Sequence, residues 1–159
     1  MINFFETHES GVMRPSGIPH SATHLATQLA RMKLVAPEIT NLKDVKLPPY
    51  YPITDVMRKD VARHYDNISL MDHRLGTIIR ALEEDGLFED TIIIWTSDHG
   101  DGLPRAKREL LDSGIKVPLL IKLQCTAETK CSAKTDERLV SFVDLAPTIL
   151  SLVNAPLPH

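Results

Sequence analysis

Residues 55–122 place one long helical pattern before two short strand patterns, and this order limits the folds open to the chain. Apolar side chains recur at spacings of three and four over residues 55–85, which predicts a helix that Asp55 caps and Gly86 ends. Residues 91–96 and 117–122 are continuous runs of apolar and β-branched residues. Such runs are typical of parallel strands buried on both faces. The alternation predicts an α/β sheet flanked by helices.

The sequence on either side of this segment is less regular. Residues 9–54 contain six of the eleven prolines and are expected to form a long irregular excursion with a short helix at about residues 21–32. A helical turn is expected near residues 104–111. A last helix is expected to start at Asp144 or Pro147 and to run through Leu152, after an extended segment or short strand at residues 139–142.

Composition excludes several classes of partner for this 159-residue chain. The formal net charge of −3 gives no basic footprint for nucleic acid, and no polybasic segment is present for an anionic membrane surface. No apolar run is long enough to span a bilayer, and residues 1–6 do not read as a secretory signal. The compartment stays open. Residues 2–5 read as a strand with only Met1 before it, so we expect a sheet that is truncated at the N-terminus.

The turn after the first strand pattern is the first candidate site. Asp98 and His99 follow the apolar run directly, and Gly100 and Gly102 allow a tight turn that brings both side chains to one ion. Ligands are expected beyond the carboxyl ends of strands in such sheets. Asp101 either adds an oxygen ligand or caps the following segment. Oxygen ligands favour calcium or magnesium, an imidazole favours zinc, and a turn with no metal is the alternative.

A histidine, a lysine and two cysteines complete the set of candidate site residues. His8 follows the first strand pattern and suits an anion or a general acid, while a polar loop residue is the alternative. Lys107 lies nine residues after Asp98 and can hold an anionic ester, or it belongs to a solvated basic turn. Cys125 and Cys131 are expected to form a local disulfide or free thiols. The remaining histidines are expected at the surface or in loops: His20, His24, His64, His73 and His159.

These segments, taken in order, resemble the sulfatase family of the alkaline-phosphatase-like superfamily. The resemblance extends along nearly the whole chain from about residue 50 to 155, and residues 48–50 fit the branch of heparan N-sulfatase-like and arylsulfatase-like enzymes. The segments that carry it are residues 4–8, 65–72 with Gly76, 82–91, 96–100, Lys107, 112–119 and 143–150.

The resemblance implies an alkaline-phosphatase-like fold and metal-assisted hydrolysis of sulfate esters or sulfamates on sulfated sugars or aryl sulfates. Members of the family use a formylglycine nucleophile and a divalent cation, usually Ca²⁺. By position, Asp98 and His99 correspond to metal ligands. Lys107 corresponds to a lysine that contacts the sulfate, and His8 to a histidine that binds the sulfate or assists the leaving group.

Two features of the family pattern are missing from these 159 residues. The nucleophile motif, a cysteine or serine followed two residues later by proline or alanine and two further on by arginine, does not occur. The paired aspartates of the first strand are also absent. We therefore expect residues 1–159 to be part of a sulfatase catalytic domain, with a strand end and excursion at 1–54 and a helix–strand–helix–strand–helix core at 55–155, inactive by itself. The alternatives are a phosphonate or phosphodiester hydrolase of the same superfamily, or a non-catalytic module with a structural metal turn.

Overall fold

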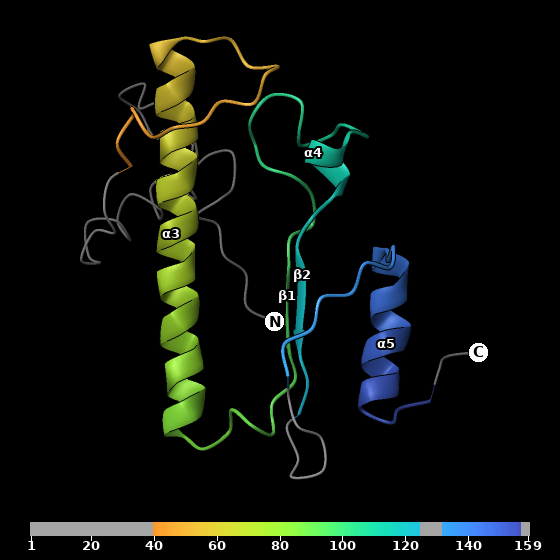
Figure 1. The fold of residues 1–159 in the computed structure, drawn as a ribbon. Coiled ribbons are helices and arrows are strands. Elements are labelled where there is room, and N and C mark those ends of the chain that lie inside the picture. The colour runs from red at the N-terminus through yellow and green to blue at the C-terminus, as the bar shows by residue number, and fades with distance from the viewer. Residues whose placement is uncertain (1–39, 125–131, 157–159) are drawn as a thin grey trace, which may run out of the picture. The chain divides into compact units, whose positions relative to one another are not determined.

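The computed structural model describes residues 40–124 and 132–156, which fall into two compact units, residues 1–126 and 127–159 (Figure 1). The predicted short helix at residues 21–32 and the strand pattern at 2–5 lie outside the described residues. The first unit contains α3 (Asp55–Glu84), β1 (Ile93–Thr96), α4 (Asp112–Ile115) and β2 (Leu119–Lys122). The second contains the 3₁₀ helix η1 (Phe142–Asp144) and α5 (Leu145–Leu152).

The long helix α3 is confirmed, and side-chain and backbone caps define its two ends. Thr54, one residue before the predicted cap, accepts a hydrogen bond from the Met57 amide at 3.2 Å through its hydroxyl. At the other end Gly86 has a φ of +68°. The amides of Gly86 and Leu87 donate to the carbonyls of Glu83 and Leu82, at 3.0 and 2.8 Å, which is a Schellman motif.

The buried face of α3 agrees only in part with the one that its apolar spacing predicts: the apolar positions in its second half are half-buried, but several in its first half are exposed. Val61 is buried as expected, but Val56, Tyr65 and Ile68 are exposed by 37–46%. The buried positions include the polar Asp60 and Asn67 besides Leu70. The core of this unit joins the first turns of α3 to the segment before it and consists of Val45, Tyr51, Met57, Val61 and Ala62, with Leu47 and Leu103 packed against it.

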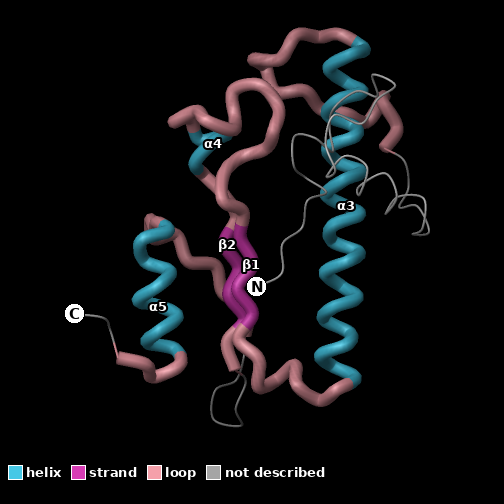
Figure 2. Tube along the Cα trace, turned by 180° about the vertical axis from the view of Figure 1, so that it is seen from behind, coloured by secondary structure: helices cyan, strands magenta, loops and turns pink. Residues whose placement is uncertain are grey.

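The two strands are confirmed at slightly shorter lengths, but they pair antiparallel (Figure 2). Ile93 lies opposite Lys122, and Thr96 lies opposite Leu119. The expectation of parallel strands was wrong because their connection contains only loops and the four-residue α4. Residues 97–118 are long enough for a parallel crossover, but they lack the full helix that usually carries the chain back to the starting edge of the sheet.

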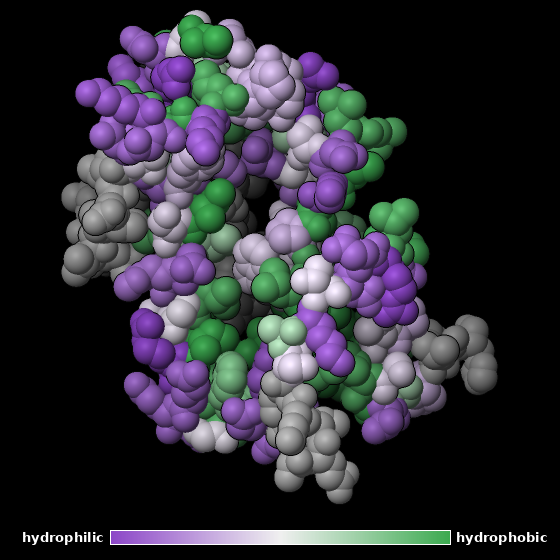
Figure 3. Space-filling view, in the orientation of Figure 1, coloured by the Kyte–Doolittle hydropathy of each residue, from purple (hydrophilic) through white to green (hydrophobic). Residues whose placement is uncertain are grey.

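The strands are also less buried than a parallel pair within a sheet. All four residues of β1 are half-buried, and in β2 Leu120 is 58% exposed. Apolar side chains therefore reach the surface among polar ones, as the space-filling view shows (Figure 3). Further exposed apolar residues in the first unit are Ile53, Leu110 and Ile115.

The expected helical turn at residues 104–111 forms turns instead. Arg105 and Arg108 have φ values of +65° and +71°, and a right-handed helix cannot pass through such residues. The four-residue α4 begins after them. No helix in the described part of the chain combines the length and apolar character that a membrane span requires.

The second unit is built around α5, whose start agrees with the prediction at Asp144. Ser141 and Asp144 form a capping box, in which the Asp144 carboxylate accepts from the Ser141 amide at 2.7 Å. The expected extended entry leads into η1 rather than into a strand. Asn154, with φ of +53°, ends α5, and the Ala155 amide donates to the Leu150 carbonyl at 2.8 Å.

Candidate functional site

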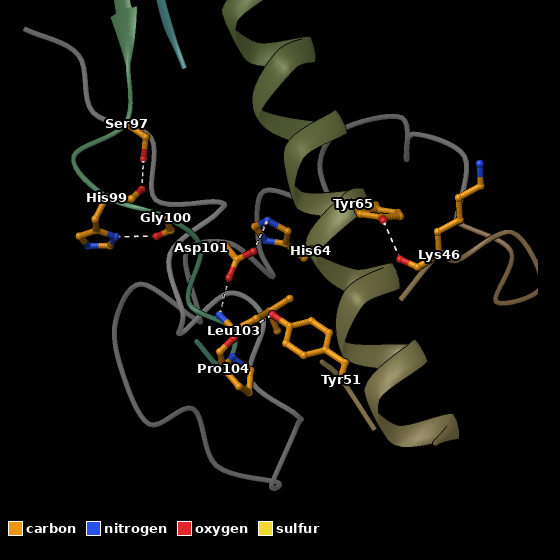
Figure 4. Close-up of polar contacts among 10 residues, drawn as sticks. All are labelled: Lys46, Tyr51, His64, Tyr65, Ser97, His99, Gly100, Asp101, Leu103 and Pro104. Atoms are coloured by element: carbon orange, nitrogen blue, oxygen red, sulfur yellow. Dashed lines mark hydrogen bonds and ion pairs between the residues drawn. The ribbon is translucent and has the colours of Figure 1, made fainter. Parts of the chain in front are cut away.

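The candidate site is the loop that leaves β1, residues 97–108, which we call the post-β1 loop (Figure 4). Its first turn is held by its own side chains. The Ser97 hydroxyl donates to the His99 carbonyl at 2.7 Å, and the Leu103 amide donates to Asp101 Oδ1 at 2.8 Å. Asp101 thus caps the following segment, which is one of the two roles expected for it.

Asp98 and His99 bring a carboxylate and an imidazole together at the start of this loop. Asp98 Oδ2 lies 3.5 Å from His99 Nε2, and the two side chains are 85% and 35% exposed. His99 Nδ1 lies 2.6 Å from the Gly100 carbonyl oxygen. A carbonyl oxygen only accepts, so Nδ1 carries the proton in the neutral ring and Nε2 has a lone pair directed away from the backbone.

Glycine is required where the post-β1 loop meets α4. The Gly100 amide donates to the Gly114 carbonyl at 2.8 Å. A Cβ on Gly100 would overlap the Ser113 carbonyl, and a Cβ on Gly114 would overlap the carbonyls of Ala106 and Glu109. The Ser113 hydroxyl also donates to the Arg105 carbonyl. Two backbones therefore approach each other directly, which fixes the turn just after His99.

Two contacts attach the post-β1 loop to α3 and the segment before it (Figure 4). The Tyr51 hydroxyl donates to the Pro104 carbonyl at 3.0 Å. His64 Nε2 lies 3.8 Å from Asp101 Oδ2, and the His64 side chain is 12% exposed. Burial raises the pKa of Tyr51, with a further contribution from the Asp101 charge, so its phenol stays protonated. Burial lowers the pKa of His64, although the Asp101 charge opposes this effect.

Lys107 lies in the same loop as Asp98 and His99. Its backbone amide donates to the Asp101 carbonyl at 3.0 Å, which joins the end of the loop to its first turn. The Lys107 side chain lines an open hollow of about 270 Å³. The described lining residues are Gly102, Leu103, Pro104, Arg105, Lys107 and Arg108. The residues that line this hollow thus follow the Asp98–His99 pair in the sequence and include three cations.

Three of the four predicted site residues thus lie in one loop held by backbone hydrogen bonds. His8, Cys125 and Cys131 lie outside the described residues. Within residues 40–124 and 132–156, no group of three or more His, Cys, Asp or Glu side chains is arranged to hold a metal. The described part of the chain therefore contributes a pair of potential ligands.

Two residues that support the loop were not predicted from the sequence. His64 was expected at the surface, but it is largely buried and faces Asp101. Its spacing from Asp60 and Asn67, four and three residues along α3, was the available signal, because these polar positions share the helical face of Met57 and Val61. Tyr51 carried no comparable signal, since its partner Pro104 lies 53 residues away.

Comparison with known proteins identifies the family. The chain is 36% identical to an ulvan-active sulfatase from Formosa agariphila over 96% of the chain and 28% of that protein. It is 33% identical to human N-sulphoglucosamine sulphohydrolase over 77% of the chain and 24% of that protein. It is 35% identical to bovine arylsulfatase K over 62% of the chain and 18% of that protein. The chain thus spans less than a third of the length of these relatives.

The family model covers almost the whole chain, whereas no solved structure matches it significantly. The model is that of the sulfatase domain, which implies an alkaline-phosphatase-like α/β fold, and it matches residues 7–155. This range contains α3, both strands, the post-β1 loop and α5. The chain belongs to the sulfatase family.

Proposed function

We propose that this chain is part of a metal-assisted hydrolase of sulfate esters or sulfamates, acting on sulfated sugars or aryl sulfates. The relatives it matches are named as an ulvan-active sulfatase, an N-sulphoglucosamine sulphohydrolase and an arylsulfatase. The observation that carries the proposal is the pairing of Asp98 Oδ2 and His99 Nε2 at 3.5 Å in the loop that also contains Lys107.

The Asp98–His99 pair fits a divalent cation in spacing and in chemistry. Two ligands about 2.4 Å from one cation at a right angle are about 3.4 Å apart, close to the observed separation. The hydrogen bond to the Gly100 carbonyl keeps Nε2 unprotonated in the neutral ring, as metal binding requires. When bound, the cation supplies positive charge that stabilises the sulfuryl oxygens. Calcium takes six to eight oxygen ligands, so other groups would complete the set.

Lys107 would hold the anionic ester next to this pair. Its ammonium group is a point charge, and the hydrogen bond from its amide to Asp101 sets where its backbone lies. A fixed cation that faces developing negative charge lowers the barrier without reorganisation during the reaction. His8 would bind the same sulfate or assist the leaving group, as the family resemblance implies.

We further propose that the 159 residues form part of a catalytic domain and do not turn over a sulfate ester by themselves. The nucleophile motif of the family does not occur in them. Sustained hydrolysis of an aryl sulfate by the isolated chain with Ca²⁺, abolished by Asp98→Ala, would overturn this part of the proposal. The control is Lys116→Ala, which removes an exposed charge outside the post-β1 loop.

Cation binding tests the Asp98–His99 pair directly. We expect weak Ca²⁺ binding in calorimetry, because two side chains compete poorly with water. Asp98→Ala and His99→Ala should each abolish it, while Glu84→Gln, an exposed carboxylate at the end of α3, should leave it unchanged. Equal Ca²⁺ affinity in Asp98→Ala and Glu84→Gln would rule out this assignment.

A chimera tests the activity. The segment of the ulvan-active sulfatase that aligns with this chain is replaced by residues 1–159, and hydrolysis of a sulfated substrate is measured. We expect the chimera to retain activity and Lys107→Ala to lower kcat/KM about 100-fold, the usual effect of removing one electrostatic contact to a transition state. A folded chimera in which Lys107→Ala and Lys116→Ala behave alike would contradict the role of Lys107.

A further inference from the structure

A buried polar pair on α3 takes no part in the proposed hydrolysis. His64 and Asn67 lie three residues apart on this helix, so their side chains are neighbours on one face. Asn67 is 0% exposed, and the His64 side chain is 12% exposed. Within the described residues, the buried Nδ1 of His64 and both polar atoms of the Asn67 amide have no hydrogen-bond partner. Burying these atoms costs free energy unless another group bonds to them.

The other side of the His64 ring faces the post-β1 loop (Figure 4). Its Nε2 lies 3.8 Å from Asp101 Oδ2, which is longer than a hydrogen bond but close enough for the carboxylate to orient the ring. A carboxylate favours an N–H that points toward it, so Nε2 carries the proton and Nδ1 has a lone pair. Burial lowers the pKa of His64 more than the Asp101 charge raises it, which favours this neutral ring.

The unpartnered atoms define the chemistry of what can bind between them. His64 Nδ1 and the Asn67 carbonyl oxygen are acceptors, and the Asn67 NH₂ group is a donor. A metal cation would meet the amide donor, and an anion would meet two acceptors. A water molecule both donates and accepts, and buried waters typically make about three hydrogen bonds to otherwise unpaired groups. Water therefore fits this set of atoms better than an ion of either sign.

Asp101 connects His64 to the residue proposed to hold the sulfate ester. Its Oδ1 accepts from the Leu103 amide at 2.8 Å, and its carbonyl accepts from the Lys107 amide at 3.0 Å. Asp101 thus holds both the first turn and the end of the post-β1 loop. His64 faces the other carboxylate oxygen of Asp101, so a shift of the imidazole is transmitted to the backbone that carries Lys107.

We propose that His64 is a positioning residue for Lys107 and that an internal water molecule bridges His64 Nδ1 and the Asn67 side chain. The neutral ring, protonated on Nε2, orients Asp101, and Asp101 sets where the loop places the Lys107 backbone. The water and Asn67 hold the ring in this tautomer. The effect on hydrolysis rests on the proposed function, whereas the tautomer, the water and the position of the loop do not.

Nitrogen-15 NMR of the 159-residue chain at neutral pH tests the tautomer and the water. We expect a neutral His64 with its proton on Nε2, and a cross-peak between water and His64 Hε1 with the sign of a long-lived bound water. Asn67→Leu keeps a branched side chain without polar atoms and should remove this cross-peak. Asp101→Asn should move the His64 proton to Nδ1, because an amide that still accepts from Leu103 presents a donor to the ring.

Two substitutions at His64 separate positioning from packing. The Gln amide nitrogen can take the place of Nε2, whereas the shorter Asn side chain reaches only to the place of Nδ1. In His64→Gln, the Leu103 and Lys107 amides should therefore keep most of their protection in hydrogen exchange. In His64→Asn they should exchange about 10-fold faster, the effect of about one lost polar contact. The same two changes at His73, which is exposed on α3, should affect neither amide.

A double-mutant cycle in the chimera with the ulvan-active sulfatase tests the consequence for hydrolysis. We expect His64→Asn to lower kcat/KM about 10-fold, and to have no further effect when Lys107→Ala is already present, because the two residues act through one contact. His64→Gln should retain most of the activity. A purely structural role for His64 would instead lower kcat/KM by the same factor in both backgrounds.

Four results would overturn the positioning role. They are an Nδ1–H ring in the parent chain, no long-lived water beside it, equal loop exchange in His64→Gln and His64→Asn, and independent effects of His64→Asn and Lys107→Ala. An inactive chimera would contradict the proposed function alone, and the NMR and exchange results would still decide the positioning role. The parent-chain spectra decide the tautomer and the water whichever variants fold, and thermal melting confirms that each variant used is folded.

Discussion

Adding one methyl group at Gly100 should loosen the post-β1 loop and reduce the stability of the first unit. The added Cβ would overlap the Ser113 carbonyl, which belongs to the backbone and cannot rotate away. Forcing such an overlap costs about 1–3 kcal/mol. Losing the 2.8 Å hydrogen bond from the Gly100 amide to the Gly114 carbonyl adds about 0.5–1.5 kcal/mol. Gly100→Ala should therefore lower the free energy of unfolding by about 2–4 kcal/mol.

Gly76→Ala is the matched control because it adds the same methyl group where there is room. Gly76 lies inside α3, and among the described residues a Cβ there would approach Arg80 Nη1, at 3.5 Å, which is the far end of a flexible side chain. Alanine is favoured over glycine in a helix by about 0.8–1 kcal/mol, so this variant should be more stable than the parent. Relative to the parent chain, Gly100→Ala should therefore be less stable and Gly76→Ala more stable.

Urea unfolding followed by circular dichroism measures both changes, with an unchanged m-value as the check that the unfolded states are comparable. Hydrogen exchange at the Leu103 and Lys107 amides reports whether the loop opens locally before the unit unfolds. An unchanged urea midpoint and unchanged exchange rates in Gly100→Ala, or a midpoint that shifts in the same direction as that of Gly76→Ala, would refute the predicted overlap.

The contacts between the loop and α3 give two further predictions. Tyr51→Phe removes the hydroxyl that donates to Pro104, so stability should fall by about 1 kcal/mol in urea unfolding, and an unchanged midpoint would show that this hydrogen bond contributes nothing. The pKa of His64 is lower in the folded chain, so the unfolded state binds the proton first and stability should fall as the pH drops below about 6.5, by about 1.4 kcal/mol per unit of pKa difference. The loss of stability is complete once the pH has fallen below the pKa that His64 has in the folded chain. His64→Gln should flatten this part of the stability–pH curve, and a variant with the parent's slope would assign the titration to another group.

Local signals were sufficient for α3 and α5 and for the positions of the strands. Gly86 marks the end of α3 and Thr54, next to the expected cap, its start, while the Ser141–Asp144 capping box starts η1, which α5 follows directly. These features depend on residues within one or two turns of each other. The strand positions likewise follow from short apolar runs that a turn terminates.

Contacts between distant residues could not be predicted in the same way. The antiparallel pairing of Ile93 with Lys122 depends on how a 22-residue connection returns, which no local pattern fixes. Arg105 and Arg108 lie where a helical turn was expected, and no local pattern indicated their left-handed φ values. His64 was misjudged because its burial depends on a loop that lies more than thirty residues further along the chain.

The same distant contacts explain how a loop can hold a ligand pair in place. Asp98 is exposed and His99 is only half-buried, so packing on their own side chains does little to order them. Order must come from the backbone that carries them, and that backbone is fixed on one side by Gly114 and on the other by Asp101 and Pro104. Asp101 lies next to His64 of α3, and the Pro104 carbonyl accepts a hydrogen bond from Tyr51. The first turns of α3 and the segment before it therefore belong functionally to the site, although none of their residues needs to touch a substrate.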